Sequence, residues 1–147
     1  MIRLALCLVA GLFPAAAGAE SLRDALIGNW ALTEGSQRAT DAESAALVDA
    51  SCADPQFGAG RGLVIGVDQD RFAIEVWEGG EMLEAWEFDS QVRGARLDDG
   101  RIAMRFSVDQ TPTHELTYWR AVIEGTERGL LEFLGPPVQS AFYMKCR

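Results

Sequence analysis

The sequence predicts an all-β protein of eight or nine antiparallel strands, which follow one another as an up-and-down meander and close into a small barrel. From residue 61 onward, apolar and polar residues alternate over runs of six to nine positions, the pattern of half-buried strands. Each run stops at Gly, Asp or Pro, the residue types that form tight turns. A meander exposes its first and last strands, so we expect these two strands to pair and close the barrel.

The first 19 residues have the pattern of a secretory signal peptide. Arg3 precedes an apolar run over residues 4–13, and small residues then lead to Ala19, where we expect cleavage. The run is too short to span a bilayer, and no later segment is continuously apolar over about 18 residues. We therefore expect residues 20–147 to form a single domain without a membrane span, in the periplasm or outside the cell.

The strands are expected in a regular series with one long connection. The first strand begins near Trp30, and the long connection follows it over residues 35–60. In that connection, Thr40 takes the N-cap position of a capping box with Glu43, which opens a short Ala-rich helix. The later strands are expected at residues 62–68, 71–78, 81–89, 91–97, 101–108, 114–124, 128–134 and 139–146.

Two cysteines remain when Cys7 leaves with the signal peptide. Cys52 and Cys146 are expected to form a disulfide, because an exported protein folds in an oxidising compartment. The bond would tie the end of the chain to its first third. A redox-active pair usually has a close Cys-x-x-Cys spacing, which the sequence lacks.

Gly28 and Trp30 form a Gly-x-Trp motif at the start of the first strand. A wide, flat indole can plug the end of a barrel, and Gly28 lets the incoming chain pass close beneath it. With the meander and the long first connection, this motif resembles that of the lipocalin and calycin group of barrels. The resemblance implies that a basic side chain from late in the barrel packs over the tryptophan. Lys145, Arg147 and Arg120 are all candidates for it.

The same stretch is similar to the start of the exported inhibitors of serralysin-type metalloproteases. Ser21 and Leu22 match their short N-terminal arm, and Gly28, Trp30 and Leu32 match the Gly-x-Trp-x-Leu start of their small barrel. In those proteins the arm enters the protease cleft. The cysteine placement departs from that family, whose disulfide begins just after the first strand and closes a much shorter loop.

The composition argues against several classes of function. The chain has 22 acidic and 13 basic side chains and a net charge of −9, so we expect neither a nucleic acid nor an anionic membrane surface as partner. His114 is the only histidine, which excludes a two-histidine zinc site, and we expect it at a strand end or on the surface. The sequence contains no Gly-x-Ser-x-Gly, phosphate-binding loop or dinucleotide motif. We therefore expect no enzyme, no cofactor and no metal.

Two charged residues share the predicted inward faces of their strands. Glu84 alternates with Met82, Trp86 and Phe88, and the same alternation places Arg120 with the inward residues of its strand. Buried charges pair, so one hypothesis is a contact between Glu84 and Arg120 in the barrel interior, as a strut or as an anchor for a ligand. The alternative is a β-bulge that turns one strand, so that both side chains point to water.

The sequence thus favours a monomeric, non-catalytic binding or interaction barrel whose partner is a small molecule or a protein. The barrel could hold a small apolar ligand, and the alternative is a periplasmic inhibitor of a secreted metalloprotease that acts through an arm over residues 20–26. Large aromatic side chains supply most of the contact area of a small site. The pocket candidates are therefore Trp77, Glu84, Trp86, Phe106, Tyr118, Arg120 and Phe142.

Overall fold

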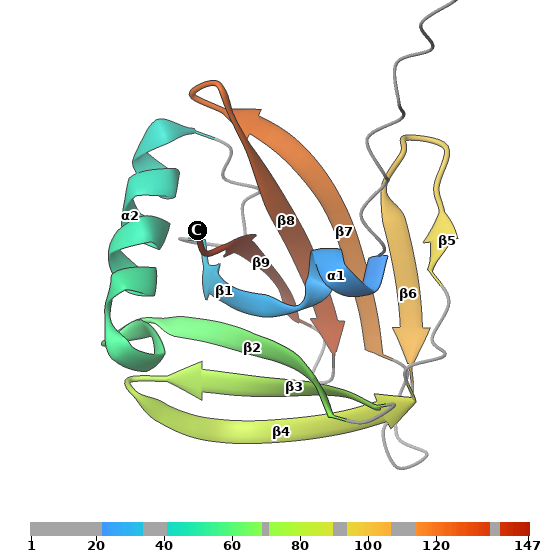
Figure 1. Cartoon of the computed structure of the whole chain (residues 1–147), viewed down its shortest axis with the longest axis horizontal. Coiled ribbons are helices and arrows are strands. Elements are labelled where there is room, and N and C mark those ends of the chain that lie inside the picture. Colours follow the sequence, from blue (N-terminus) through green and yellow to red (C-terminus); the bar gives the residue numbers. More distant parts are fainter. Residues whose placement is uncertain (1–21, 34–40, 69–70, 90–93, 107–113, 136–138) are drawn as a thin grey trace, which may run out of the picture.

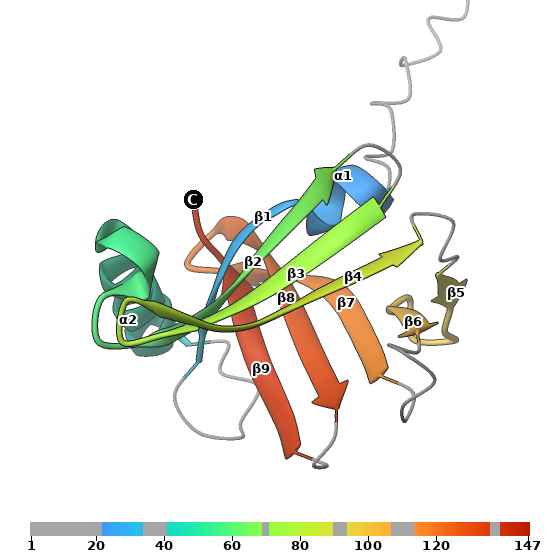
Figure 2. The same cartoon turned by 90° about the horizontal axis from the view of Figure 1, so that it is seen from below.

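The computed structural model describes residues 22–33, 41–68, 71–89, 94–106, 114–135 and 139–147, so the predicted signal peptide lies outside the described residues. These ranges form one curled antiparallel sheet of nine strands with three helical segments (Figures 1 and 2). In chain order the elements are α1 (Leu22–Leu26), β1 (Gly28–Leu32), α2 (Ala42–Ala53), the 3-10 helix η1 (Pro55–Phe57), β2 (Arg61–Asp68), β3 (Arg71–Glu78), β4 (Glu81–Asp89), β5 (Ala95–Arg96), β6 (Ile102–Phe106), β7 (His114–Ile123), β8 (Thr126–Gly135) and β9 (Gln139–Lys145).

The first strand pairs with the last. The strand order is β4-β3-β2-β1-β9-β8-β7-β6-β5, and Trp30 of β1 lies opposite Lys145 of β9. The Cys146 amide donates a hydrogen bond of 2.9 Å to the Asn29 carbonyl in the same seam. These pairings confirm the all-β meander. Across the described ranges, however, the two outer strands β4 and β5 do not pair with each other, so the sheet is a curled half-barrel rather than a closed one.

The helix α2 forms in the one long connection, as the sequence predicts, but it begins one residue later than expected. Asp41 is the N-cap, and its carboxylate accepts a hydrogen bond of 2.8 Å from the Ser44 amide. Thr40 lies outside the described residues. The helix ends at Ala53, just before Pro55, which cannot continue it.

Both faces of the sheet are covered, so the protein has two apolar cores. The concave core lies inside the curl and is capped by α1; its buried members are Ala25, Leu26, Trp30, Leu63, Ile65, Phe72, Ile74, Met104, Leu116, Tyr118, Leu131 and Tyr143. The convex core lies between the sheet and α2 with η1; its buried members are Ala31, Ala45, Val48, Phe57, Ile123, Leu130 and Met144. Strand alternation therefore sends apolar residues to both faces, as with Leu63 and Val64 in β2.

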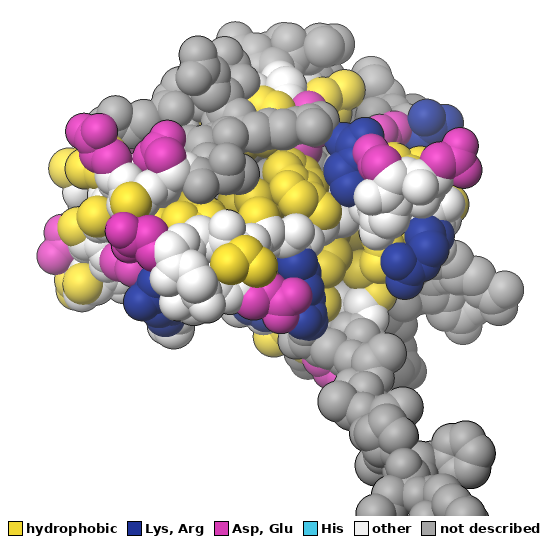
Figure 3. All heavy atoms as spheres, turned by 90° about the horizontal axis from the view of Figure 1, so that it is seen from above, with side chains coloured by type: hydrophobic (Ala, Val, Ile, Leu, Met, Phe, Trp, Pro, Cys, Tyr) yellow, Lys and Arg dark blue, Asp and Glu magenta, His cyan; other side chains and the backbone are white. Residues whose placement is uncertain are grey.

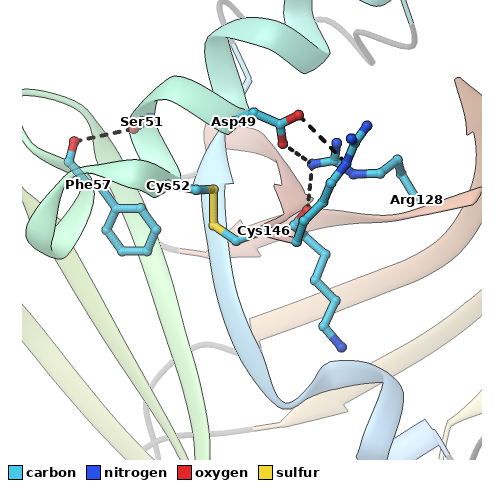
Figure 4. The surroundings of a disulfide bond; sticks show 8 residues. Asp49, Ser51, Cys52, Phe57, Arg128 and Cys146 are labelled. Carbon is cyan, nitrogen blue, oxygen red and sulfur yellow. Dashed lines mark hydrogen bonds and ion pairs between the residues drawn. A yellow bond between two sulfur atoms is a disulfide. The ribbon is translucent and has the colours of Figure 1, made fainter. Parts of the chain in front are cut away.

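The predicted disulfide is present and fastens α2 to the end of the chain. Cys52 in α2 is bonded to Cys146, 94 residues later (Figure 4). Beside it, the buried guanidinium of Arg128 donates to Asp49 of α2 at 2.9 Å and to the Lys145 carbonyl at 2.8 Å. Three covalent and polar links thus join α2, β8 and β9 at one point. In the described part of the chain, no helix has the length and apolar character needed to cross a membrane.

Candidate binding site beside α1

Trp30 occupies the end of the half-barrel below α1. Its side chain is fully buried, and its indole Nε1 donates a hydrogen bond of 2.9 Å to the carbonyl of Leu26, the last residue of α1. The Tyr118 ring meets the indole edge to face at a centroid distance of 6.2 Å. A buried indole needs a partner for its N–H, and here the helix end provides it. The plug expected from Gly28 and Trp30 therefore has a definite contact, the C-terminal end of α1.

Lys145 is the basic side chain that packs over this tryptophan. Its Nζ lies 5.7 Å from the Trp30 ring centroid and donates to the Ala25 carbonyl at 2.7 Å and to the Asp24 carbonyl at 3.4 Å. Burial lowers the pKa of Lys145, and the Arg120 guanidinium lowers it further. Gly28 has a φ of +134°, and a Cβ there would lie 3.2 Å from the Lys145 Cε. The glycine therefore makes room for the lysine stem.

The other two candidates have different partners. The Nε of Arg147 lies 3.6 Å from an Asp49 carboxylate oxygen, at the α2 end of the molecule. Arg120 donates from Nη1 to the Glu127 carboxylate at 3.0 Å and from Nε to the Tyr118 hydroxyl, also at 3.0 Å.

A pocket of about 610 Å³ opens between α1 and the strands β5 to β7. Its apolar lining comes from Leu22 and Ala25 of α1, Ile102 of β6 and Tyr118 of β7. The rest of the lining is made by Arg96, Asp99, Gly100, Arg101, Trp119 and Arg120. Figure 3 looks onto this end of the molecule, where dark blue basic side chains border a recess that contains hydrophobic side chains. The pocket is therefore amphipathic, with apolar walls beside three guanidinium groups.

The three arginines differ in how they are paired. Arg101 donates to the Asp99 carboxylate at 2.6 Å, and the Arg101 backbone amide, which also donates to this carboxylate, lowers the pKa of Asp99. Arg120 is held by Glu127 and Tyr118 as described above. Arg96 donates only to the Gly100 carbonyl at 3.4 Å and makes no ion pair with any described residue. One guanidinium at the pocket is thus available to an anion.

A second, smaller hollow adjoins the first. It has a volume of about 210 Å³ and shares Tyr118 and Arg120 with the pocket, and it is also lined by Lys145. Burial raises the pKa of Tyr118, so its hydroxyl is protonated and can donate at neutral pH. The end of the half-barrel around α1 therefore gathers four basic side chains in a protein whose net charge is −9.

Two of the predicted pocket residues, Tyr118 and Arg120, line this pocket. Trp86 faces the concave side but lies toward the opposite end of the curl, where its ring stacks on Phe133 at 5.4 Å. The side chain of Phe106 lies outside the described residues. Trp77 and Phe142, two more of the aromatic candidates, face the convex side of the sheet. Trp77 packs against the convex core, and Phe142 follows Ala141 and precedes Tyr143, which both pack on the concave core.

Glu84 and Arg120 lie on the predicted face but do not meet. Glu84 of β4 pairs with Val76, which packs on the concave core, and Arg120 alternates with the concave residue Tyr118. In the sheet, however, β4 is an outer strand that does not pair with β7. Arg120 of β7 instead forms an ion pair with Glu127 on the neighbouring strand β8. Glu84 is exposed and forms no ion pair with a described residue. The expected strut is therefore absent from the described part of the structure.

His114 is the first residue of β7, at a strand end as expected, but it is not on the surface. Its side chain is buried between aromatic rings, 5.1 Å from Trp86 and 5.7 Å from Phe133 by ring centroids. A Cβ on Gly135 would lie 2.8 Å from the imidazole, so this glycine lets the ring pack closely. This cluster fills the end of the curl away from α1. The interior is thus occupied by side chains, and the large pocket lies at its mouth.

Sequence reasoning missed the residues that α1 and the β5–β6 hairpin bring to the pocket. Leu22 and Ala25 precede the first predicted strand. Arg96, Arg101 and Ile102 lie in the predicted strands at residues 91–97 and 101–108, but none of them is a large aromatic residue. A signal was present, because the segment 93–105 holds four of the 13 basic residues of this acidic chain. Across the described ranges, no three His, Cys, Asp or Glu side chains gather as a metal site. Comparisons with protein families, with curated proteins and with solved structures find no match to this chain.

Proposed function

We propose that this protein is an exported, non-catalytic binding barrel that holds a small amphipathic anion in the pocket beside α1. The observation that carries the proposal is the pocket of about 610 Å³, whose apolar walls stand beside three arginines although the protein is strongly acidic. Small-molecule sites are concavities of about this size in which polar groups orient the ligand beside apolar walls. The ligand class that matches is a carboxylate, sulfonate or phosphate joined to an apolar part.

Arg96 is the residue assigned to the anionic group. Its guanidinium has one long hydrogen bond to a carbonyl and no carboxylate partner among the described residues. A planar guanidinium binds carboxylates and phosphates through paired N–H donors, and such charged hydrogen bonds are about twice as strong as neutral ones. Arg101 and Arg120 already have carboxylate partners, so they contribute mainly positive potential.

The site differs from the one expected from sequence, an apolar ligand inside the barrel. Trp30 fills one end of the concave core and the cluster of Trp86, His114 and Phe133 fills the other. We therefore propose that the ligand binds at the mouth. The lysine over the Trp30 ring, hydrogen-bonded to the end of α1, supports the calycin-like resemblance of the Gly-x-Trp start. The disulfide supports export, because disulfides persist in oxidising compartments.

The inhibitor alternative requires a free arm over residues 20–26. Leu22–Leu26 form α1, whose Ala25 and Leu26 are buried and whose carbonyls accept hydrogen bonds from Lys145 and Trp30. An arm docked in this way favours the binding function.

The test is a fluorescence titration with anilinonaphthalene sulfonate, an apolar dye that carries one anionic group. Arg96→Gln should weaken binding by about tenfold, the loss of one charged hydrogen bond. The matched control is Arg105→Gln on β6, where the arginine is paired with Glu115 and lies outside the pocket lining. Phenylnaphthylamine, which lacks the sulfonate, should bind both variants like the wild type. Equal affinities of the two variants for the sulfonate would overturn the proposal.

A further inference from the structure

The outer edge of β4 is a long strand edge that no described residue covers. β4 runs from Glu81 to Asp89 and is the last strand of the sheet on its side, paired only with β3 among the described strands. Figure 1 shows it at the outer margin of the molecule. A bulge interrupts its pairing between Val76 and Trp77, and from Glu84 to Asp89 the pairing with β3 is regular. The unpaired backbone groups of such an edge are a template for another strand.

The side chains of this edge combine apolar and acidic groups. Met82 and Leu83 are 52% and 51% exposed, which is a large exposure for adjacent apolar residues. Glu81 and Glu84 are exposed and have no ion-pair partner among the described residues, whereas Glu87 pairs with Arg71. β4 contains no Lys, Arg or Pro, the residue types that commonly protect edges. The edge therefore has negative charge and apolar surface to offer a partner.

The same charges disfavour a second copy of this chain as the partner. Antiparallel pairing of two β4 edges centred on Glu84 would place Glu84 opposite Glu84. Like charges directly opposite each other destabilise a strand pair, and opposite charges stabilise it. The charges of β4 thus disfavour this pairing with a second copy and favour a strand that carries basic residues.

We propose that the β4 edge binds an extended segment of a partner protein, rich in Lys or Arg alternating with apolar residues, by adding it to the sheet as a further strand. Backbone hydrogen bonds supply affinity in this mode of recognition, and alternate side chains supply specificity. Basic side chains of the segment pair with Glu81 and Glu84, and its apolar side chains cover Met82 and Leu83. This surface is separate from the pocket beside α1 and does not depend on the function proposed for it.

The test uses a fluorescein-labelled octapeptide that alternates Lys and Val, with anisotropy as the readout and the full folded domain as the receptor. Glu84→Lys should weaken binding by about tenfold, because an attractive cross-strand charge pair becomes a repulsive one. The matched control is Glu43→Lys in α2, which makes the same change in net charge at an exposed glutamate away from the edge. It should bind the peptide almost like the wild type. High salt should weaken binding to the wild type.

Two further measurements separate strand addition from simple charge attraction. A Lys-Val peptide with every backbone amide N-methylated has the same charge but no N–H to donate to a strand ladder, so it should not bind. Hydrogen exchange read by mass spectrometry should show new protection of the amides between Glu81 and Glu87 when the unmethylated Lys-Val peptide binds. Equal binding of the N-methylated peptide, equal loss in Glu84→Lys and Glu43→Lys, or protection at α1 instead of β4 would each overturn the proposal.

Discussion

Lys145 should be the residue that holds α1 on the half-barrel, and Lys145→Met tests this. Methionine keeps most of the length of the stem that passes Gly28 but removes the ammonium group. The substitution therefore deletes the hydrogen bonds to the Ala25 and Asp24 carbonyls and the cation above the Trp30 ring, and it leaves packing largely unchanged.

The size of the effect follows from these contacts. A hydrogen bond from a charged donor contributes about 1.5 to 3 kcal/mol, and a cation over an aromatic ring at a partly exposed site contributes about 0.5 to 1 kcal/mol. Burial of the ammonium group opposes this, as the lowered pKa of Lys145 indicates. We therefore expect Lys145→Met to lower the free energy of unfolding by about 2 kcal/mol.

Urea denaturation gives this free energy, and hydrogen exchange of the Trp30 indole N–H reports on α1 directly, since that group donates to Leu26. Exchange should become faster in Lys145→Met. The control is Arg147→Met, whose side chain is 60% exposed and lies 3.6 Å from Asp49; it should lose less than about 0.5 kcal/mol. Equal losses in the two variants, with unchanged indole exchange, would show that Lys145 does not hold α1.

Two further predictions concern stability. Replacing Cys52 and Cys146 with Ala should lower the free energy of unfolding, measured in urea, by about 4 to 5 kcal/mol, because the disulfide closes a long loop in the unfolded chain. A reductant should destabilise the wild type by the same amount and leave the stability of the variant unchanged. Tyr143 is 3% exposed, and burial raises its pKa to about 12 from 10.0, so the folded state keeps a proton that the unfolded state loses. The free energy of unfolding should therefore fall by at most about 3 kcal/mol between about pH 10 and pH 12. Urea denaturation of Tyr143→Phe should show a smaller fall over this range. Equal pH profiles of the variant and the wild type would show that Tyr143 does not cause the fall.

The strands, the disulfide and the role of Trp30 as a plug could be predicted, because each depends on local or compositional information. Alternation marks strands wherever at least one face is buried, and the predicted loss of Cys7 with a signal peptide leaves two cysteines and one pairing. The Gly-x-Trp start fixes the position of the plug in the chain. The choice of Lys145 over Arg147 needed the register of β1 with β9, which places Lys145 opposite Trp30.

The face of each aromatic residue could not be predicted, because this sheet buries both of its faces. Period-two alternation separates two faces but does not say which one is concave when α2 covers the other. Phe142 alternates with Tyr143 and falls on the convex side for this reason. The proposed contact of Glu84 with Arg120 failed for a different reason. Alternation gave each side chain its face, but only the strand order shows that β4 and β7 are not neighbours.

The pocket and the free β4 edge follow from one property of this sheet, its incomplete closure. A barrel closed by hydrogen bonds around its whole circumference has no edges, and a small one is filled by its own side chains. Here the described part of β5 spans only Ala95 and Arg96, and it does not pair with β4. One margin of the open sheet therefore leaves β4 available to a further strand. The other margin leaves Arg96 beside the mouth pocket, with α1 as its opposite wall.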